Sequence, residues 1–297
     1  MHDVLIIGGS YAGLAAALQL ARARRTVLVL DAAQPRNRFA RAAHGFLGHD
    51  GEAPDAIRER GRADVLAYPT ASIRAEVATA ITGTQGDFRV TTDRDVHHAR
   101  RIILATGVVD QPPPIPGLRE RWGNTVFHCP YCHGYELDRG RLGVIATSAL
   151  SMHQAVLATE WGRETRLFLN DAFDPDAEQL AELAARGITL ERRRITHATG
   201  GPGAIELHVE GGDRFVLDGV FVLPHTEIRD GFAAQLGLAL EAGPLGPYYK
   251  TDPMKETSVS GVFACGDVGQ PMGTVAFAVA DGTRAGASAH QSLVFRR

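Results

Sequence analysis

One stretch near the amino terminus restricts the possible fold more than any other part of the chain. Residues 4–7 form a short apolar run, residues 12–24 are rich in Ala and Leu, and residues 27–30 form a second apolar run. A strand, a helix and a second strand in this order make a βαβ unit, whose strands lie parallel in one sheet. The sequence therefore predicts an α/β protein that begins with a Rossmann-like, three-layer domain.

The turn between the first strand and the helix carries a dinucleotide-binding fingerprint, Gly8-Gly9-Ser10-Tyr11-Ala12-Gly13. Gly8 would form the tight turn, Gly13 would let the helix pack on the strand, and the helix amino terminus would face a pyrophosphate. Ser10 replaces the middle glycine, but serine is small and can donate to a phosphate. Asp31 ends the second strand, where a carboxylate accepts from a ribose hydroxyl. A turn needed only for packing and a Gly-x-Ser-x-Ala hydrolase elbow remain the alternatives.

A weaker copy of the same pattern follows about 138 residues later. It consists of strands at 142–146 and 166–169 around a helix at 150–161. A repeat at this distance predicts two related nucleotide-fold domains.

Turn-rich segments set the expected domain boundaries. Three prolines at 112–114 form one linker, and a Gly-Pro-rich stretch at 243–247 forms a second. The strand and helix that follow the second linker would complete the first domain. We therefore expect a discontinuous domain of residues 1–111 and 241–297, with residues 112–240 inserted as a second domain.

Two cysteines three positions apart, Cys129 and Cys132, supply the candidate chemistry. In an intracellular protein such a pair usually opens and closes as a redox disulfide, and its thiolate form is the reactive one. A structural zinc site would need a second pair of ligands, and Cys265 is the one cysteine left, so we expect no metal. With His133 the segment also fits the haem c attachment pattern, and Cys-Pro-Tyr-Cys is the pair found in glutaredoxins.

Composition and charge exclude several classes of partner. Lys and Arg number 31 against 34 Asp and Glu, a net charge of −3, so no electrostatic footprint for nucleic acid is visible. The sequence contains no run of 18 apolar residues, so it predicts no membrane-spanning helix. Three cysteines without a recognisable export signal predict a reducing, cytoplasmic location, which also disfavours the haem interpretation.

The carboxy-terminal part holds a third motif, in which a strand runs into Cys265-Gly266-Asp267. An aspartate at this position can accept hydrogen bonds from a polyol chain, although it can also simply cap the turn. A helix that begins near Thr274-Val275-Ala276 would point its positive end at the same place. Cys265 itself is expected to be a small buried apolar side chain.

The order of these motifs, together with Ala105-Thr106-Gly107, resembles the low-molecular-weight thioredoxin reductase family over essentially the whole chain. The resemblance implies a homodimer that binds FAD in the discontinuous domain and carries the cysteines in the inserted one. Cys132 would lie against the flavin and Cys129 would be the outer thiol. His133 stands where the reductases have Asp, and it would serve as a proton shuttle unless it is only an exposed loop residue.

The resemblance also implies a set of FAD-binding positions. They are Gly8, Ser10, Tyr11, Ala12, Gly13, Asp31, Asn37, Arg38, His44, Val77, Ala105, Thr106, Gly107, Gly266, Asp267, Thr274, Val275 and Ala276.

The second nucleotide turn departs from the reductase pattern. Residues 146–151 contain no glycine, and residues 170–174 are acidic where a 2′-phosphate needs cations, so NADPH binding is unlikely on this sequence. The chain then resembles the dithiol oxidase branch of the family, of the gliotoxin or holomycin type. We expect it to oxidise a small-molecule dithiol through Cys129 and Cys132, with FAD passing electrons to O2 and H2O2 formed. The alternatives are reduction of a thioredoxin-like protein, with NADPH or ferredoxin as donor, and a non-catalytic flavin redox sensor.

Overall fold

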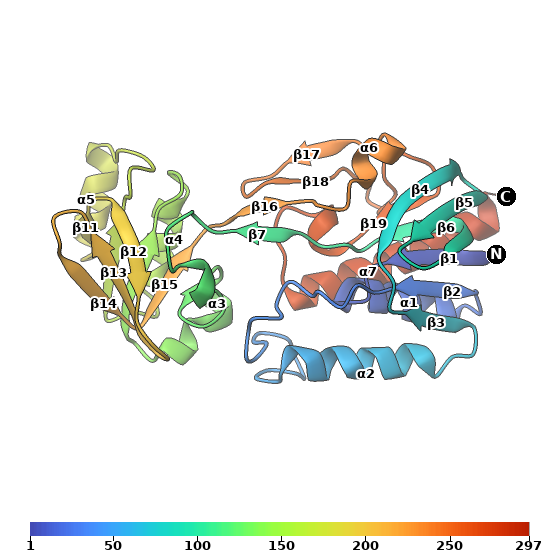
Figure 1. The fold of residues 1–297 in the computed structure, drawn as a ribbon, viewed down its shortest axis with the longest axis horizontal. Helices are drawn as coiled ribbons and strands as arrows, with labels where there is room; N and C mark the ends of the chain where they lie inside the picture. The colour runs from blue at the N-terminus through green and yellow to red at the C-terminus, as the bar shows by residue number, and fades with distance from the viewer. Residues whose placement is uncertain (297) are drawn as a thin grey trace.

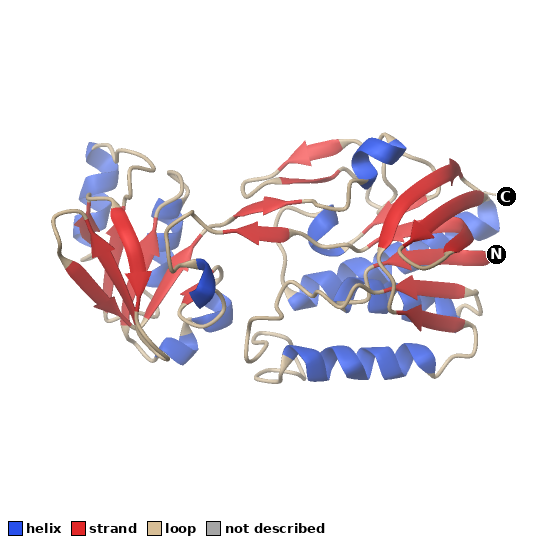
Figure 2. Ribbon diagram, in the orientation of Figure 1, coloured by secondary structure: helices blue, strands red, loops and turns tan. Residues whose placement is uncertain are grey.

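The computed structural model describes residues 1–296, which form two lobes joined by a pair of strands (Figure 1). The chain leaves the first lobe through β7 (Val109–Gln111) and returns through β16 (His225–Glu227). These strands pair antiparallel, so the two crossings lie side by side. Both lobes combine helices and strands in layers (Figure 2), which confirms the predicted α/β class.

The first lobe is built on a seven-stranded sheet with the order β3-β2-β1-β6-β5-β4, and β19 pairs with β6. The strands are β1 (His2–Ile7), β2 (Val27–Leu30), β3 (Ala71–Arg74), β4 (Ala78–Thr84), β5 (Asp87–Thr92), β6 (Val96–Leu104) and β19 (Val262–Ala264). β1, β2, β3, β6 and β19 run parallel to one another, whereas β4 and β5 pair antiparallel. Because parallel strands end at one edge of a sheet, the loops that follow them meet there.

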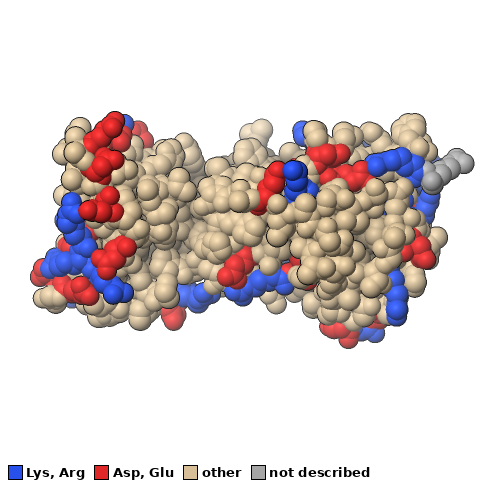
Figure 3. Space-filling view, turned by 90° about the horizontal axis from the view of Figure 1, so that it is seen from above, with Lys and Arg blue, Asp and Glu red and all other residues tan. Residues whose placement is uncertain are grey.

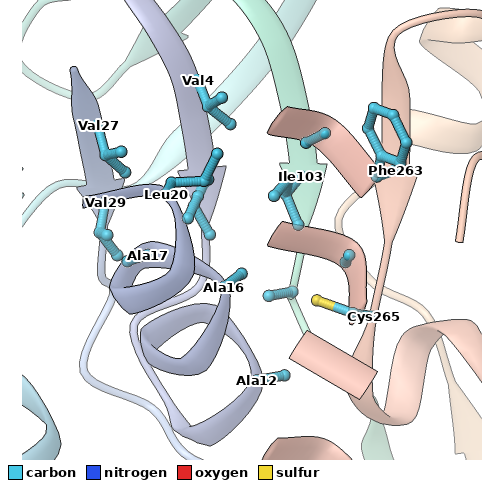
Figure 4. Close-up of a cluster of buried hydrophobic side chains, with 14 of the residues drawn as sticks. Val4, Ala12, Ala16, Ala17, Leu20, Val27, Val29, Ile103, Phe263 and Cys265 are labelled. Atoms are coloured by element: carbon cyan, nitrogen blue, oxygen red, sulfur yellow. The ribbon is translucent and has the colours of Figure 1, made fainter. Parts of the chain in front are cut away.

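Two layers cover this sheet. One face packs against α1 (Tyr11–Arg22), α2 (Pro54–Leu66) and α7 (Val275–Phe295). The other packs against α6 (Phe232–Leu236) and the hairpin of β17 (Leu240–Ala242) and β18 (Pro247–Tyr249). α7 approaches α1 so closely that a β-carbon on Gly282 would collide with the carbonyl oxygen of Ala12. Figure 4 shows this core, into which the fully buried Cys265 points, as the sequence predicted.

The second lobe repeats the layered plan on a smaller scale. Its five-stranded sheet has the order β11-β10-β9-β15-β8. The strands are β8 (Val126–Phe127), β9 (Arg141–Ile145), β10 (Glu164–Phe168), β11 (Thr189–Glu191) and β15 (Gly219–Val222), and all of them run parallel. Helices α4 (Ser151–Ala158) and α5 (Ala177–Ala185) pack on one face. A three-stranded sheet of β12 (Ile195–Thr199), β13 (Ile205–Val209) and β14 (Arg214–Leu217) packs on the other.

One expected domain boundary differs from the structure. The sequence placed the return to the first domain at residue 241, at the start of the second turn-rich segment. The side chains of Phe232 and Leu238 are nevertheless buried against Leu5 and Ile7 of the first sheet. The return therefore falls at β16, because the apolar residues of α6 fill the uncovered face of that sheet. Among residues 1–296, no helix has both the length and the apolar character needed to cross a bilayer.

Candidate redox site

The predicted cofactor-binding positions gather at one edge of the first sheet. Gly8, Asp31 and Ala105 directly follow β1, β2 and β6, and Gly266 follows β19 after one residue. These four strands are parallel, so motifs up to 258 residues apart in the chain lie on one surface. This is where an open α/β sheet binds its ligand.

The glycine turn has the geometry of a phosphate cradle. Gly8 has a positive φ of +112°, and a β-carbon there would collide with the carbonyl oxygen of Ala105. A β-carbon on Gly13 would collide with the carbonyl oxygen of Gly8, so both positions require glycine. Ser10 is the N-cap residue of α1 but makes no side-chain cap. The N–H groups of Ala12 and Gly13 have no acceptor within residues 1–296, which leaves them for an anion.

Polar side chains continue this surface along the second strand. Asp31 accepts from the Ala33 N–H at 2.9 Å and forms an ion pair with Arg62 at 3.3 Å. The Tyr11 hydroxyl donates to the carbonyl of Pro54, and the Asn37 side-chain amide donates to it, each at 3.1 Å. These contacts fix the loop after β2 against the amino end of α1.

The Thr106 side chain binds the half-buried carboxylate of Asp230. Its hydroxyl donates to Asp230 at 2.6 Å, and the Tyr249 hydroxyl donates to the same carboxylate at 2.5 Å. Burial and Asp230 raise the pKa of Tyr249. A β-carbon on Gly107 would meet no atom within 4 Å, so the backbone beside Thr106 borders open space.

The Gly266-Asp267 motif begins the 3-10 turn η3 (Gly266–Gly269). The Gly266 N–H donates to Asp281 of α7 at 2.9 Å, and Lys255 forms an ion pair with Asp281 at 3.0 Å. Thr274 caps α7 by accepting from the Phe277 N–H at 3.1 Å, so Val275 and Ala276 occupy its first turn as predicted.

The family resemblance pointed to Arg38 in the loop after β2, but Arg36 is the arginine that joins the motifs. Arg36 donates to both carboxylate oxygens of Asp110 and, at 2.9 Å, to Asp267. Arg38 instead donates to the Pro35 carbonyl and lies over the Phe39 ring on the surface. Arg36 and its neighbours Pro35 and Asn37 are partly buried in an irregular loop, where no periodic sequence pattern indicates burial.

These residues fit FAD. The glycine turn and the free N–H groups of α1 would hold the pyrophosphate, Asp31 would accept from the ribose, and Asp267 from the ribityl chain. Val77 lies shortly after the end of β3, the strand that pairs with β2. Its side chain is 46% exposed and therefore accessible, so a contact between Val77 and FAD stays a prediction.

The two cysteines lie together on the second lobe. Cys129 is the N-cap residue of α3 (Pro130–His133), and Cys132 lies within that helix. The Cys132 thiol donates to the Cys129 sulfur at 2.6 Å. This bond lowers the pKa of Cys129 to about 7, assisted by the N–H groups of Cys132 and Tyr131. The same bond, with burial, raises the pKa of Cys132.

The residue before the pair connects the two lobes. His128 lines a small pocket together with Arg36, Asp267 and Gly273, all from the first lobe. Burial, and next to it the charge of Arg36, lowers the pKa of His128 to about 4. The chain therefore enters α3 directly beside the carboxyl edge of the first sheet.

His133 is held as an uncharged, unpartnered base. Its ring stacks on Phe127 with centroids 4.4 Å apart. Both ring nitrogens are buried without a hydrogen-bond partner among residues 1–296. Burial lowers the pKa of this imidazole below its ordinary value of 6.5. His44 of the first lobe lies 3.5 Å from Glu136, so the loop that carries it contacts the segment after His133.

The second nucleotide turn differs from the first in its hydrogen bonds. The N–H groups of Ser151, Met152 and His153, which open α4, already donate to carbonyls of residues 148–150. The Thr147 N–H donates to the Ser151 hydroxyl at 3.1 Å. The first three N–H groups of α4 are therefore engaged, whereas the N–H groups of Ala12 and Gly13 in the first turn of α1 are not.

Cations do lie near the acidic segment after β10, but they are paired. Arg192 contacts Asp174 at 3.1 Å, and Arg194 contacts Asp171 at 3.3 Å. Because each guanidinium already faces a carboxylate, this corner carries little free positive charge for a 2′-phosphate.

Fold and site together define a two-lobed nucleotide-binding oxidoreductase with a vicinal dithiol. The family model for pyridine nucleotide-disulphide oxidoreductases matches residues 2–282, and the chain belongs to that family. The chain is 33% identical to thioredoxin reductase sirT of Leptosphaeria maculans over 96% of its own length and 92% of the relative.

Solved structures extend the comparison. An oxidoreductase from Agrobacterium tumefaciens superposes with a TM-score of 0.96 at 49% identity, covering 100% of this chain and 99% of that one. HlmI superposes with a TM-score of 0.90 at 34% identity, covering 99% and 92%. The chain is thus a thioredoxin reductase-like flavoprotein that acts on thiols and disulfides.

Proposed function

We propose that this protein is an FAD-dependent dithiol oxidase that converts a small-molecule dithiol into a disulfide. One contrast carries the proposal. The Cys129–Cys132 pair directly follows His128, which lines a pocket with Arg36 and Asp267 of the first lobe, whereas the first three N–H groups of α4 at the second nucleotide turn are already used. Without nicotinamide as an electron source, the dithiol itself is the source.

The cysteines would act by thiol–disulfide exchange. A substrate thiolate attacks the Cys129 sulfur of the Cys129–Cys132 disulfide, and Cys132 leaves as the thiolate. The second substrate thiolate attacks the substrate sulfur of this mixed disulfide, which releases the cyclic product and the Cys129 thiolate. The low pKa of Cys129 depends on a hydrogen bond from the Cys132 thiol, so it makes Cys129 a good leaving group in that second step once Cys132 has taken up a proton released by the substrate.

Proton and electron balance complete the cycle. His133 is the candidate base for one substrate thiol, because its imidazole is neutral and free to accept a proton. FAD, when bound, would accept two electrons as the Cys129 and Cys132 thiolates re-form their disulfide, and O2 would take up these electrons with two protons as H2O2. We further propose that the protein works as a homodimer.

A second candidate function is reduction of a thioredoxin-like protein with electrons from NADPH. The relatives of Leptosphaeria maculans and Claviceps purpurea, both 33% identical to this chain, carry the name thioredoxin reductase. This candidate requires NADPH to bind at the amino end of α4, where the first three helical N–H groups are already engaged.

Anaerobic mixing separates the candidates. The holoprotein is mixed with a dithiol in one cell and with NADPH in another, and the visible absorbance of the flavin is followed. Bleaching by dithiol alone, followed by H2O2 formation on admission of air, is the expected result. Rapid bleaching by NADPH would overturn the proposal. Bleaching without repeated turnover in air would indicate a sensor.

A further inference from the structure

The segment that carries both cysteines is held by a neighbouring helix. Residues 128–134 follow β8 directly and include α3. Within residues 1–296, one side chain from outside this segment forms a hydrogen bond with it. That side chain is Gln154 of α4, whose amide nitrogen Nε2 donates to the carbonyl oxygen of His128 at 2.8 Å. The bond reaches the residue immediately before Cys129.

Gln154 occupies a position that would otherwise suit an apolar side chain. The residue is 3% exposed, and its neighbours Met152 and Ala155 on α4 belong to the apolar core of the second lobe. The Oε1 atom of Gln154 is buried without a hydrogen-bond partner among the described residues. A buried polar atom without a partner destabilises the fold, so an apolar residue would pack here at lower cost. The bond to His128 is therefore the contribution that distinguishes this amide.

The turn after α4 contacts the other end of α3. A β-carbon on Gly134 would lie 2.6 Å from the ring of Trp161, so the indole packs directly on this glycine. The Trp161 ring also meets the ring of Tyr131 at 83°, with centroids 5.2 Å apart. The segment of α4 and Trp161 thus contacts the chain on both sides of the cysteine pair.

We propose that Gln154 is a positioning residue of the redox centre, which fixes the His128 carbonyl and thereby holds Cys129 in reach of the Cys132 thiol. The peptide unit between His128 and Cys129 is planar, so a fixed carbonyl also fixes the direction in which Cys129 enters α3. The two sulfurs are 2.6 Å apart, and a hydrogen bond between them weakens steeply as its geometry departs from the ideal. Gln154 touches neither sulfur and acts through the backbone.

The expected consequence is a change in the reactivity of Cys129. The hydrogen bond from Cys132 is the largest cause of its low pKa of about 7, and the charge of Arg36 is a lesser one. Mostly uncharged side chains cover the middle of the face shown in Figure 3, where the two lobes meet. A displaced His128 carbonyl should therefore weaken the bond between the sulfurs and leave less Cys129 thiolate at neutral pH. Only the effect on turnover rests on the dithiol oxidase function proposed above.

The test measures the thiol itself. Gln154→Met keeps the length of the side chain and removes the donor. The reduced variant and the reduced wild type are alkylated with iodoacetamide across a range of pH, and peptide masses identify Cys129 as the modified residue. We expect a higher midpoint and a roughly fivefold lower rate at pH 7, because a tenfold smaller dissociation constant leaves about a tenth of the thiol ionised instead of half.

A second buried residue of α4 supplies the matched control. Met152→Ala truncates a side chain of the same apolar core, and the resulting cavity should lower the thermal midpoint at least as much as Gln154→Met does. Its alkylation midpoint should nevertheless equal that of the wild type. An equal upward shift in both variants would assign the effect to lost stability and reject the role of Gln154. If Gln154→Met does not fold, Gln154→Asn shortens the amide instead and is judged by the same midpoint.

The outcomes separate this inference from the proposed function. An unchanged alkylation midpoint in Gln154→Met overturns the positioning role, whether or not the protein oxidises dithiols. A raised midpoint in a protein that oxidises no dithiol supports the positioning role and rejects the oxidase function. Where both hold, kcat for dithiol oxidation should fall in Gln154→Met, because Cys129 becomes a poorer leaving group, and should not fall in Met152→Ala.

Discussion

The guanidinium of Arg36 lies 2.9 Å from the carboxylate of Asp267, although the two residues are 231 positions apart in the chain. The same guanidinium binds Asp110 of β7, one of the two strands that cross between the lobes. One cation therefore ties together the loop after β2, the Gly266-Asp267 motif and the connection to the second lobe. His128, two residues upstream of Pro130, lines the same pocket.

Replacing Arg36 should affect both the cofactor and the thiols. Arg36→Gln leaves Asp110 and Asp267 without their cation, and breaking a buried pair in this way costs about 3–5 kcal/mol. Its side chain is 21% exposed, so the loss should fall toward the lower end of that range. We expect weaker FAD retention and a higher pKa for Cys129, because Arg36 lowers that pKa. Arg36→Lys should recover part of both.

Two measurements check the Arg36 prediction. FAD released on gel filtration reports retention, and the rate of alkylation of the reduced protein against pH reports the pKa of Cys129. Arg38→Gln is the matched control from the same loop, since its guanidinium lies on the surface over Phe39. Identical behaviour of the Arg36 and Arg38 variants would contradict the assignment.

The thiol pair should give the reduced protein a defined pH response. Alkylation of Cys129 should rise through pH 7, because its pKa lies about there rather than near 9. A group with a lowered folded pKa adds stability above its unfolded pKa and loses it as pH falls through the folded one. The contribution of Cys129 to the free energy of unfolding should therefore grow from pH 7 to 9. Cys132→Ala tests the cause: loss of the donor at position 132 should shift the alkylation midpoint upward, and an unchanged midpoint would exclude the Cys132 bond as the reason for the low pKa of Cys129.

Much of the fold was predictable because its signals are local. The apolar runs of β1 and β2 and the glycine turn between them specify a βαβ unit within thirty-one residues. Cys265 was correctly predicted to be buried. The boundary at residue 241 was wrong because the burial of Phe232 and Leu238 depends on an uncovered sheet face, which no local pattern reveals.

The site was predictable where a motif marked it and missed where contacts are long-range. Gly8, Asp31 and Gly266 lie on one surface as expected, because strand ends and glycine turns specify them. Arg36 was missed, since its partners lie 74 and 231 positions away. Lys255 was missed for the same reason, because only the fold brings it to α7.

His133 should control the rate at acid pH. Because burial lowers its pKa below 6.5, the imidazole is neutral at pH 7 and activity should fall as pH drops through that lowered pKa. His133→Gln should reduce kcat by about 10²-fold, the usual contribution of a general base, and abolish this acid limb. His98→Gln, an exposed histidine of the first lobe, should change neither. An intact acid limb in the His133 variant would assign the titration to another group.

The Lys255–Asp281 pair should determine how firmly FAD is held. Asp281 accepts from the Gly266 N–H and faces Lys255, whose ammonium donates to the Gly269 carbonyl at 3.1 Å, so the pair fixes both ends of the turn that carries Asp267. Lys255→Met leaves a buried carboxylate unpaired, and we expect the Kd for FAD to rise at least tenfold, a loss of ~1.4 kcal/mol or more. Adding Asp281→Asn removes that charge but keeps an acceptor for Gly266, so the double variant should bind FAD more tightly than Lys255→Met alone. Lys250→Met breaks an exposed pair with Glu241 and is the matched control. Fluorescence titration of apoprotein with FAD measures each Kd, and equal values for the Lys255 and Lys250 variants would refute the role of the pair.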